Sequence, residues 1–175
     1  MTDDSKEKSG NLSLPDRAVL AIGNTAAWLV AVLIGIILVQ VVLRYVFAKS
    51  FVVLEELQWH LYAVVFLLGL SYSYVKNAHV RLDVLHASFS RATKEKIEII
   101  GIICFLWPMI YVFFMHSLPF VAESYRVGEC SEAPLGLPYR WIIKSAIPIA
   151  FFLLFVVSAS RLVQAVCYLK NKERI

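Results

Sequence analysis

Four long apolar segments, separated by short polar loops, constrain this chain of 175 residues more than any other feature. They begin near Ala18, Leu57, Ile97 and Trp141. Each is close to the length of about 20 residues that an α-helix needs to cross the hydrocarbon core of a bilayer. Because four such helices occupy most of the chain, the sequence predicts an all-α integral membrane four-helix bundle with no soluble domain.

Composition agrees with a membrane location. Hydrophobic residues make up 59% of the chain and charged residues 17%, whereas a typical soluble domain has about 45–50% apolar and ~25% charged residues. The net charge of +4 does not indicate binding to nucleic acid, because the basic residues lie at the ends of apolar segments, where they report orientation in the membrane. We expect the lipid bilayer to be a partner and expect no contact with nucleic acid.

The limits of the apolar segments predict three parts of the chain. These are an N-terminal tail over residues 1–16, a transmembrane domain over 17–169 and a C-terminal tail over 170–175. The four helices are expected at about 15–47, 52–75, 94–121 and 141–169. Pro108 lies in the middle of the third helix and is expected to kink it. Two deeper tryptophans, Trp28 and Trp107, are expected to pack inside the bundle.

The segment between the second and third helices has a different pattern. Val80, Val84, Leu85 and Phe89 fall on one helical face, and charged residues fall elsewhere. This pattern predicts a short amphipathic helix that lies in the membrane interface. An ordinary amphipathic loop is the alternative.

Loop charges give the helices a direction. The N-terminal segment, the loop between helices two and three, and the C-terminal tail share one side, and they carry most of the Lys and Arg: Lys6, Lys8, Arg17, Lys76, Arg81, Arg91, Lys94, Lys96, Lys170, Lys172 and Arg174. The other side has at most Arg44, Lys49, Arg126, Arg140 and Lys144. The positive-inside rule therefore predicts that both termini are cytoplasmic.

Patterns that carry catalytic chemistry are scarce. The sequence has no Gly-rich phosphate loop, no nucleophile elbow and no Cys/His zinc spacing. We therefore expect no catalytic residue, no metal and no cofactor, and we predict that the protein is not an enzyme. The three cysteines, Cys104, Cys130 and Cys167, are scattered and are interpreted as small buried hydrophobic residues.

Polar residues near the outer helix ends are the remaining candidates for a site. Arg44 and the pair Glu55 and Glu56 lie at the same boundary on consecutive helices, which indicates an ion pair, snorkelling to lipid headgroups, or contact with a partner. Gln40 shares a helical face with Arg44, as expected of a helix–helix interface. Trp59 fits an aromatic belt at the membrane interface.

Two histidines leave an alternative function open. His60 in helix two and His116 in helix three would lie at similar depth if these helices were antiparallel neighbours. Such a pair can ligate a b-type haem, so a haem-bearing membrane anchor of an oxidoreductase is the rival hypothesis. An intramembrane histidine more often makes a hydrogen bond between helices.

Two stretches of the chain resemble a known transporter family. The first is Glu55-Glu56-Leu57-Gln58-Trp59-His60-Leu61, followed by Gly69 and by His79-Val80-Arg81-Leu82-Asp83-Val84-Leu85. The second contains Pro119, Ser124-Tyr125, Glu129, Gly136-Leu137-Pro138, Lys144 and Ile147-Pro148. Together they resemble the small membrane subunit of tripartite ATP-independent periplasmic (TRAP) transporters, over most of residues 16–169.

The resemblance implies a function that composition does not indicate. It implies a multi-pass protein of the bacterial inner membrane whose partners are a large TRAP membrane subunit and a periplasmic substrate-binding protein. The small subunit would support the large one and help dock the binding protein during sodium-driven uptake of an organic acid. The candidate docking or structural residues are Arg44, Glu55, Glu56, Trp59, His60, Arg81, Asp83, Glu129 and Lys144. Of these, Arg81 and Asp83 are expected to pair or to meet headgroups on the cytoplasmic side.

Overall fold

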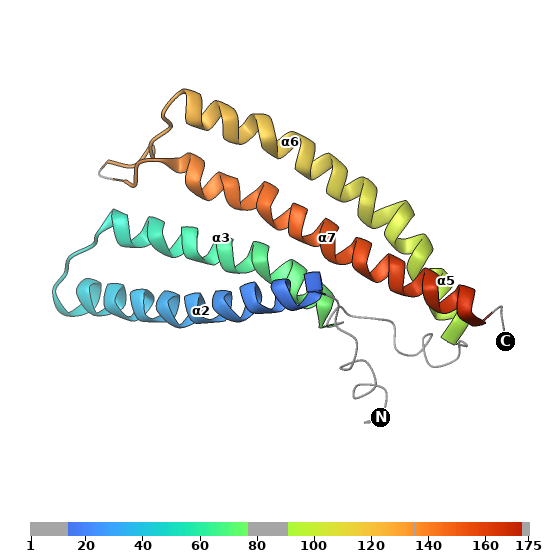
Figure 1. The fold of residues 1–175 in the computed structure, drawn as a ribbon. Helices are drawn as coiled ribbons and strands as arrows, with labels where there is room; N and C mark the ends of the chain where they lie inside the picture. The colour runs from blue at the N-terminus through green and yellow to red at the C-terminus, as the bar shows by residue number, and fades with distance from the viewer. Residues whose placement is uncertain (1–13, 77–90, 135, 173–175) are drawn as a thin grey trace.

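The computed structural model describes residues 14–76, 91–134 and 136–172. Its elements are the helices α2 (Leu14–Val46), α3 (Val52–Val75), α5 (Arg91–Gly101), the π-helix η2 (Ile102–Leu106), α6 (Trp107–Arg126) and α7 (Arg140–Lys172) (Figure 1). Because α5, η2 and α6 follow one another without a break, they form one long helix. The described residues thus contain four helices that are long and apolar enough to span a membrane, as the sequence predicts.

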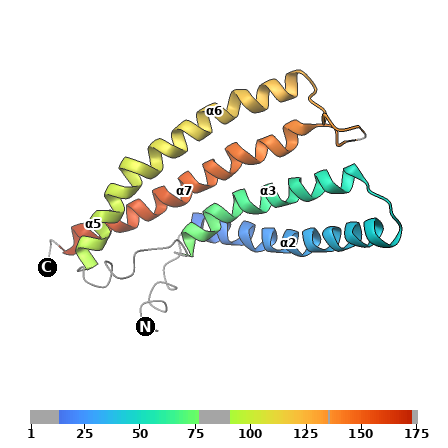
Figure 2. The same ribbon diagram turned by 180° about the vertical axis from the view of Figure 1, so that it is seen from behind.

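The helices lie side by side in the order α6, α7, α3 and α2 (Figures 1 and 2). One end of the bundle holds the start of α2, the end of α3, the start of α5 and the end of α7; we call it the terminal end. The other end, which we call the hairpin end, carries the connections 47–51 and 127–139. The three regions that are rich in Lys and Arg therefore all adjoin the terminal end.

Helix α7 is the centre of the bundle because it packs against each of the other long helices. In its most apolar stretch, 33% of the residues are buried, compared with none in the corresponding stretch of α3. A small core forms where Ile110 of α6 meets Phe151 and Leu154 of α7. The outer faces of the helices remain apolar and exposed, as expected of surfaces that meet lipid or another membrane protein.

Small residues and single hydrogen bonds join the helices, as is common in membrane proteins. Ser71 Oγ of α3 donates to the carbonyl of Ala150 in α7, at 3.3 Å. Trp107 Nε1 of α6 donates to Ser158 Oγ of α7, at 3.2 Å. Gly23 allows the Tyr72 ring to rest on the backbone of α2, since a Cβ at Gly23 would lie 2.2 Å from that ring.

The third helix changes its hydrogen-bond pattern just before Pro108. Pro108 has no N–H, and its ring crowds the carbonyl four residues earlier. The chain responds with the π-helix η2, in which the Trp107 N–H bonds to the carbonyl of Ile102, five residues back. The path of the helix steepens between α6 and α5 (Figure 2), so the predicted irregularity is present and takes the form of a π-bulge.

Several sequence expectations need correction. The third helix ends at Arg126 rather than near residue 121. Its additional last turn is exposed, and the ion pair between Glu123 and Arg126, three residues apart, lies on that turn. Trp107 packs, but Trp28 is 76% exposed because α2 lies at the edge of the bundle. The three cysteines are exposed rather than buried. The amphipathic helix predicted over residues 79–89 lies outside the described residues.

Candidate partner-docking site

Glu56 ties the loop 127–139 to helix α3. Its Oε2 accepts a hydrogen bond from the backbone N–H of Leu137 at 2.6 Å, and its Oε1 accepts one from Ser131 Oγ. Both partners lie more than 70 residues further along the chain. The first turn of α3 therefore holds the loop that connects α6 with α7, and one carboxylate joins the two halves of the hairpin end.

A glycine makes this contact possible. A Cβ at Gly136 would lie 2.4 Å from the Cβ of Ser131 and 2.8 Å from Oε1 of Glu56. Any larger residue at this position would push the loop away from the carboxylate. The turn Gly136-Leu137-Pro138 thus supplies both the close approach and the N–H of Leu137 that Glu56 binds.

Glu129 ties the same loop to the start of α7. Its carboxylate forms an ion pair with Lys144 Nζ, lies 3.8 Å from Arg140, and its backbone carbonyl accepts the Arg140 N–H at 3.1 Å. The hydrogen bond from Lys144 holds the pKa of Glu129 below its ordinary value of 4.5. Lys144 also lies over the ring of Phe120, 3.9 Å from its centre.

The expected ion pair between Arg44 and the Glu55–Glu56 pair does not form among the described residues. Glu56 turns to the loop, and both Arg44 and Glu55 are exposed. Gln40, one turn below Arg44, hydrogen-bonds to Gln58 of α3 and so confirms the predicted helix–helix contact. Arg44 and Glu55 instead line a hollow of about 300 Å³ between α2 and α3.

The two histidines are not on neighbouring helices. Helix α7 lies between α3, which carries His60, and α6, which carries His116 (Figure 1). Each Nδ1 lies close to a carbonyl of its own helix: His60 to Glu56, at 2.6 Å, and His116 to Val112, at 2.8 Å. The arrangement that the haem hypothesis requires, with both rings on facing helices, is not found. No cluster of three or more metal-binding side chains occurs among the described residues.

A second polar cluster lies at the terminal end, and sequence reasoning missed it. Arg161 of α7 contacts Glu98 of α5 through Nε and Nη2, at 2.8 and 2.7 Å, and Glu95 through Nη2, at 3.0 Å. The Glu95 side chain is only 8% exposed. Nearby, Gln164 donates to the buried Asp16 of α2, at 3.2 Å. The sequence does contain an indication of this cluster. Arg161 lies inside an apolar helix, where an arginine requires an acidic or polar partner at the same depth in the membrane.

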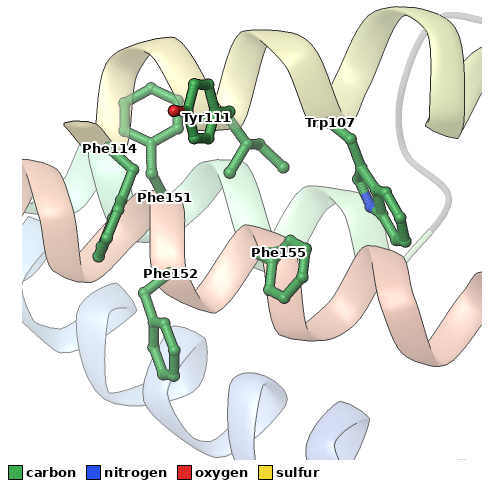
Figure 3. A pocket seen from close by; sticks show the side chains of 7 residues that line it. Trp107, Tyr111, Phe114, Phe151, Phe152 and Phe155 are labelled. Atoms are coloured by element: carbon green, nitrogen blue, oxygen red, sulfur yellow. The ribbon is translucent and has the colours of Figure 1, made fainter. Parts of the chain in front are cut away.

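An aromatic groove of about 430 Å³ runs along the seam between α6 and α7. It is lined by Trp107, Ile110, Tyr111, Phe114, Phe151, Phe152 and Phe155 (Figure 3). Trp107 and Phe155 face each other with ring centres 5.5 Å apart. Neither predicted histidine lines the groove, and its lining is almost entirely aromatic and aliphatic, so we interpret it as a membrane-embedded packing surface.

The sequence-predicted site residues thus fall into three groups. Glu56, His60, Glu129 and Lys144 make contacts within the chain. Arg44, Glu55 and Trp59 line the hollow between α2 and α3. Arg81 and Asp83 lie outside the described residues.

Four helices that are long and apolar enough to span a membrane define a multi-pass membrane protein. The ion pairs among the described residues lie at the two ends of the bundle. Residues 33–168 match the family described as tripartite ATP-independent periplasmic transporters, DctQ component. The chain belongs to this family and is therefore a small membrane component of a TRAP transporter, a system of several components. No curated protein sequence matches the chain.

Proposed function

We propose that this small subunit is a fixed scaffold for the large TRAP membrane subunit. Helix α2 has one principal neighbour, α3, and exposes Val32, Ile34, Leu38 and Val42 in its second half. Within the described residues, no pair of interrupted helices creates a binding site at mid-membrane, as transporter cores require. These features support a role in which the substrate path belongs to the partner and α2 and α3 face it.

We further propose that the loop 127–139 helps dock the periplasmic substrate-binding protein. The positive-inside rule supports an orientation in the bacterial inner membrane with the hairpin end on the periplasmic side and both termini in the cytoplasm. The observation that carries this proposal is the double attachment of the loop through Glu56 and Glu129. A docking surface binds more tightly when its shape is set before the partner arrives, because less conformational entropy is lost. By its family, the system would take up an organic acid with sodium.

Uptake measurements on single variants test the docking role. Glu56→Gln removes the charge that holds Ser131 and Leu137 and is expected to lower uptake of the substrate severalfold, while membrane insertion and association with the large subunit persist. Glu123→Gln is the matched control, because this carboxylate lies at the end of α6, outside the loop, and its ion pair with Arg126 is exposed. Equal uptake by wild type and Glu56→Gln at equal expression would remove the support for this role.

A further inference from the structure

The hollow between α2 and α3 is a feature that scaffolding and docking leave unexplained. It lies at the hairpin end and combines charged, amide, aromatic and aliphatic side chains: Ile37, Gln40, Val41, Arg44, Tyr45, Glu55, Gln58 and Trp59. The hydrogen bond between Gln40 and Gln58 joins its two walls. The shape of the hollow is therefore set by a contact between helices rather than by a loop.

Two opposite charges line this hollow without meeting. Arg44 lies in the last turn of α2 and Glu55 in the first turn of α3. Both side chains are exposed, and neither forms an ion pair with another described residue. A single ligand that carries an anionic and a cationic group, a few ångströms apart, would satisfy both.

The surroundings of the hollow match the boundary between headgroups and hydrocarbon. Tyr45 is 80% exposed and Trp59 is 68% exposed, and such aromatic residues favour the headgroup level. Below the charges, Ile37 and Val41 continue into an exposed aliphatic face of α2 that also includes Ile34 and Leu38. A ligand with a zwitterionic head and an apolar chain fits this arrangement, in which charged side chains lie above an aliphatic helix face.

We propose that the hollow binds a phospholipid whose headgroup carries a phosphate and a primary ammonium, as in phosphatidylethanolamine. Arg44 donates hydrogen bonds to the phosphate, Glu55 accepts from the ammonium, and an acyl chain lies on the face of Ile37 and Val41. Charge-assisted hydrogen bonds of this kind are stronger than neutral ones. The lipid would then be held between α2 and α3 as a bound component, a role separate from docking of the binding protein.

Native mass spectrometry of the full-length chain, purified in mild detergent, tests the proposal. The protein is offered phosphatidylethanolamine, phosphatidylglycerol and phosphatidylcholine with identical acyl chains. We expect phosphatidylethanolamine to bind best. Glu55→Gln should weaken its binding roughly tenfold, to the level of phosphatidylglycerol, since one charged hydrogen bond is lost. Arg44→Ala should weaken the binding of all three lipids, because each carries a phosphate.

Two matched controls separate this site from general surface charge. Lys49→Ala removes a neighbouring cation, and Glu132→Ala removes a carboxylate at the same end; neither residue lines the hollow, so both variants should bind lipid as the wild type does. Glu55→Gln changes an exposed side chain without changing its size, so it should fold normally. Equal binding of phosphatidylethanolamine and phosphatidylglycerol by the wild type would overturn the proposal. Loss of the large subunit from Arg44→Ala, with lipid binding unchanged, would instead assign the hollow to a protein contact.

Discussion

At the scale of single residues, the adjacent carboxylates Glu55 and Glu56 have different partners. Successive residues of an α-helix point about 100° apart. Glu56 therefore faces the loop 127–139 and binds Ser131 and Leu137, whereas Glu55 faces outward beside Arg44. The sequence identifies both as residues at the outer boundary. It cannot separate their roles, because the partner of Glu56 lies 81 residues away in a turn whose geometry depends on the packed hairpins.

The substitution Gly136→Ala tests the contact between Glu56 and the loop. The added Cβ would lie within 2.4 Å of Ser131, so the turn must shift away from Glu56. We expect a loss of about 1–3 kcal/mol in the free energy of unfolding, as is typical of overpacking. Denaturation in mixed SDS micelles measures it. Gly69→Ala is the control, because a Cβ there meets nothing within 4 Å; equal losses in the two variants would contradict the contact.

The ion pair of Glu129 predicts a dependence of stability on pH. Its pKa is lowered in the folded protein, chiefly by Lys144. The stabilisation is therefore fully present above the ordinary value of 4.5 and is lost as the pH falls below it, through the lowered pKa. Thermal unfolding of wild type and Glu129→Gln, compared at pH 7 and at acidic pH, should show the smaller change for the variant. An identical pH response in both proteins would rule out this role of Glu129.

At the scale of helices, most of the fold is predictable from the sequence. The second helix has the predicted limits, Val52–Val75, and the first is displaced by one residue at each end. The apolar segments determine these limits because backbone groups in lipid must be bonded within the helix. Side-by-side order is harder to predict, since the outward faces are as apolar as the packed ones. For this reason the sequence leaves open whether His60 and His116 lie on neighbouring helices, and its prediction that Trp28 packs inside the bundle is wrong.

The cluster around Arg161 attaches α5 to α7 and predicts a large effect of one substitution. Arg161→Ala leaves the buried Glu95 without its partner, and breaking a buried ion pair in this way costs about 3–5 kcal/mol. Arg126→Ala is the control, because the Arg126–Glu123 pair is exposed and such pairs contribute about 0–1 kcal/mol. Unfolding in SDS micelles compares them. If Arg161→Ala lowers the free energy of unfolding no more than Arg126→Ala does, the cluster does not stabilise the attachment of α5 to α7.

The approach of α2 to α3 gives a second test at this scale. A Cβ at Gly23 would lie 2.8 Å from Cβ of Tyr72 as well as closer to its ring, so the two helices must separate in Gly23→Ala. At Gly35, on the same helix, a Cβ meets nothing within 4 Å. We expect Gly23→Ala to lower the midpoint temperature of unfolding by several degrees and Gly35→Ala to leave it unchanged. The reverse order would show that α2 packs on α3 in another register.

At the scale of the whole molecule, the described residues form an open array of four long helices with little interior. The contacts of its charged residues lie at its two ends: Arg161 with two glutamates at the terminal end, and Glu56 and Glu129 around the loop at the hairpin end. Broad apolar surface remains between them. This division is consistent with the proposed role of the chain as a fixed scaffold for the large subunit.

Substrate uptake in reconstituted proteoliposomes tests this account most directly. Three preparations are compared: this chain alone, the large subunit alone, and the two together, each with the substrate-binding protein and a sodium gradient. The account predicts uptake only when both membrane subunits are present. Uptake by this chain alone, or full uptake by the large subunit without it, would contradict the account.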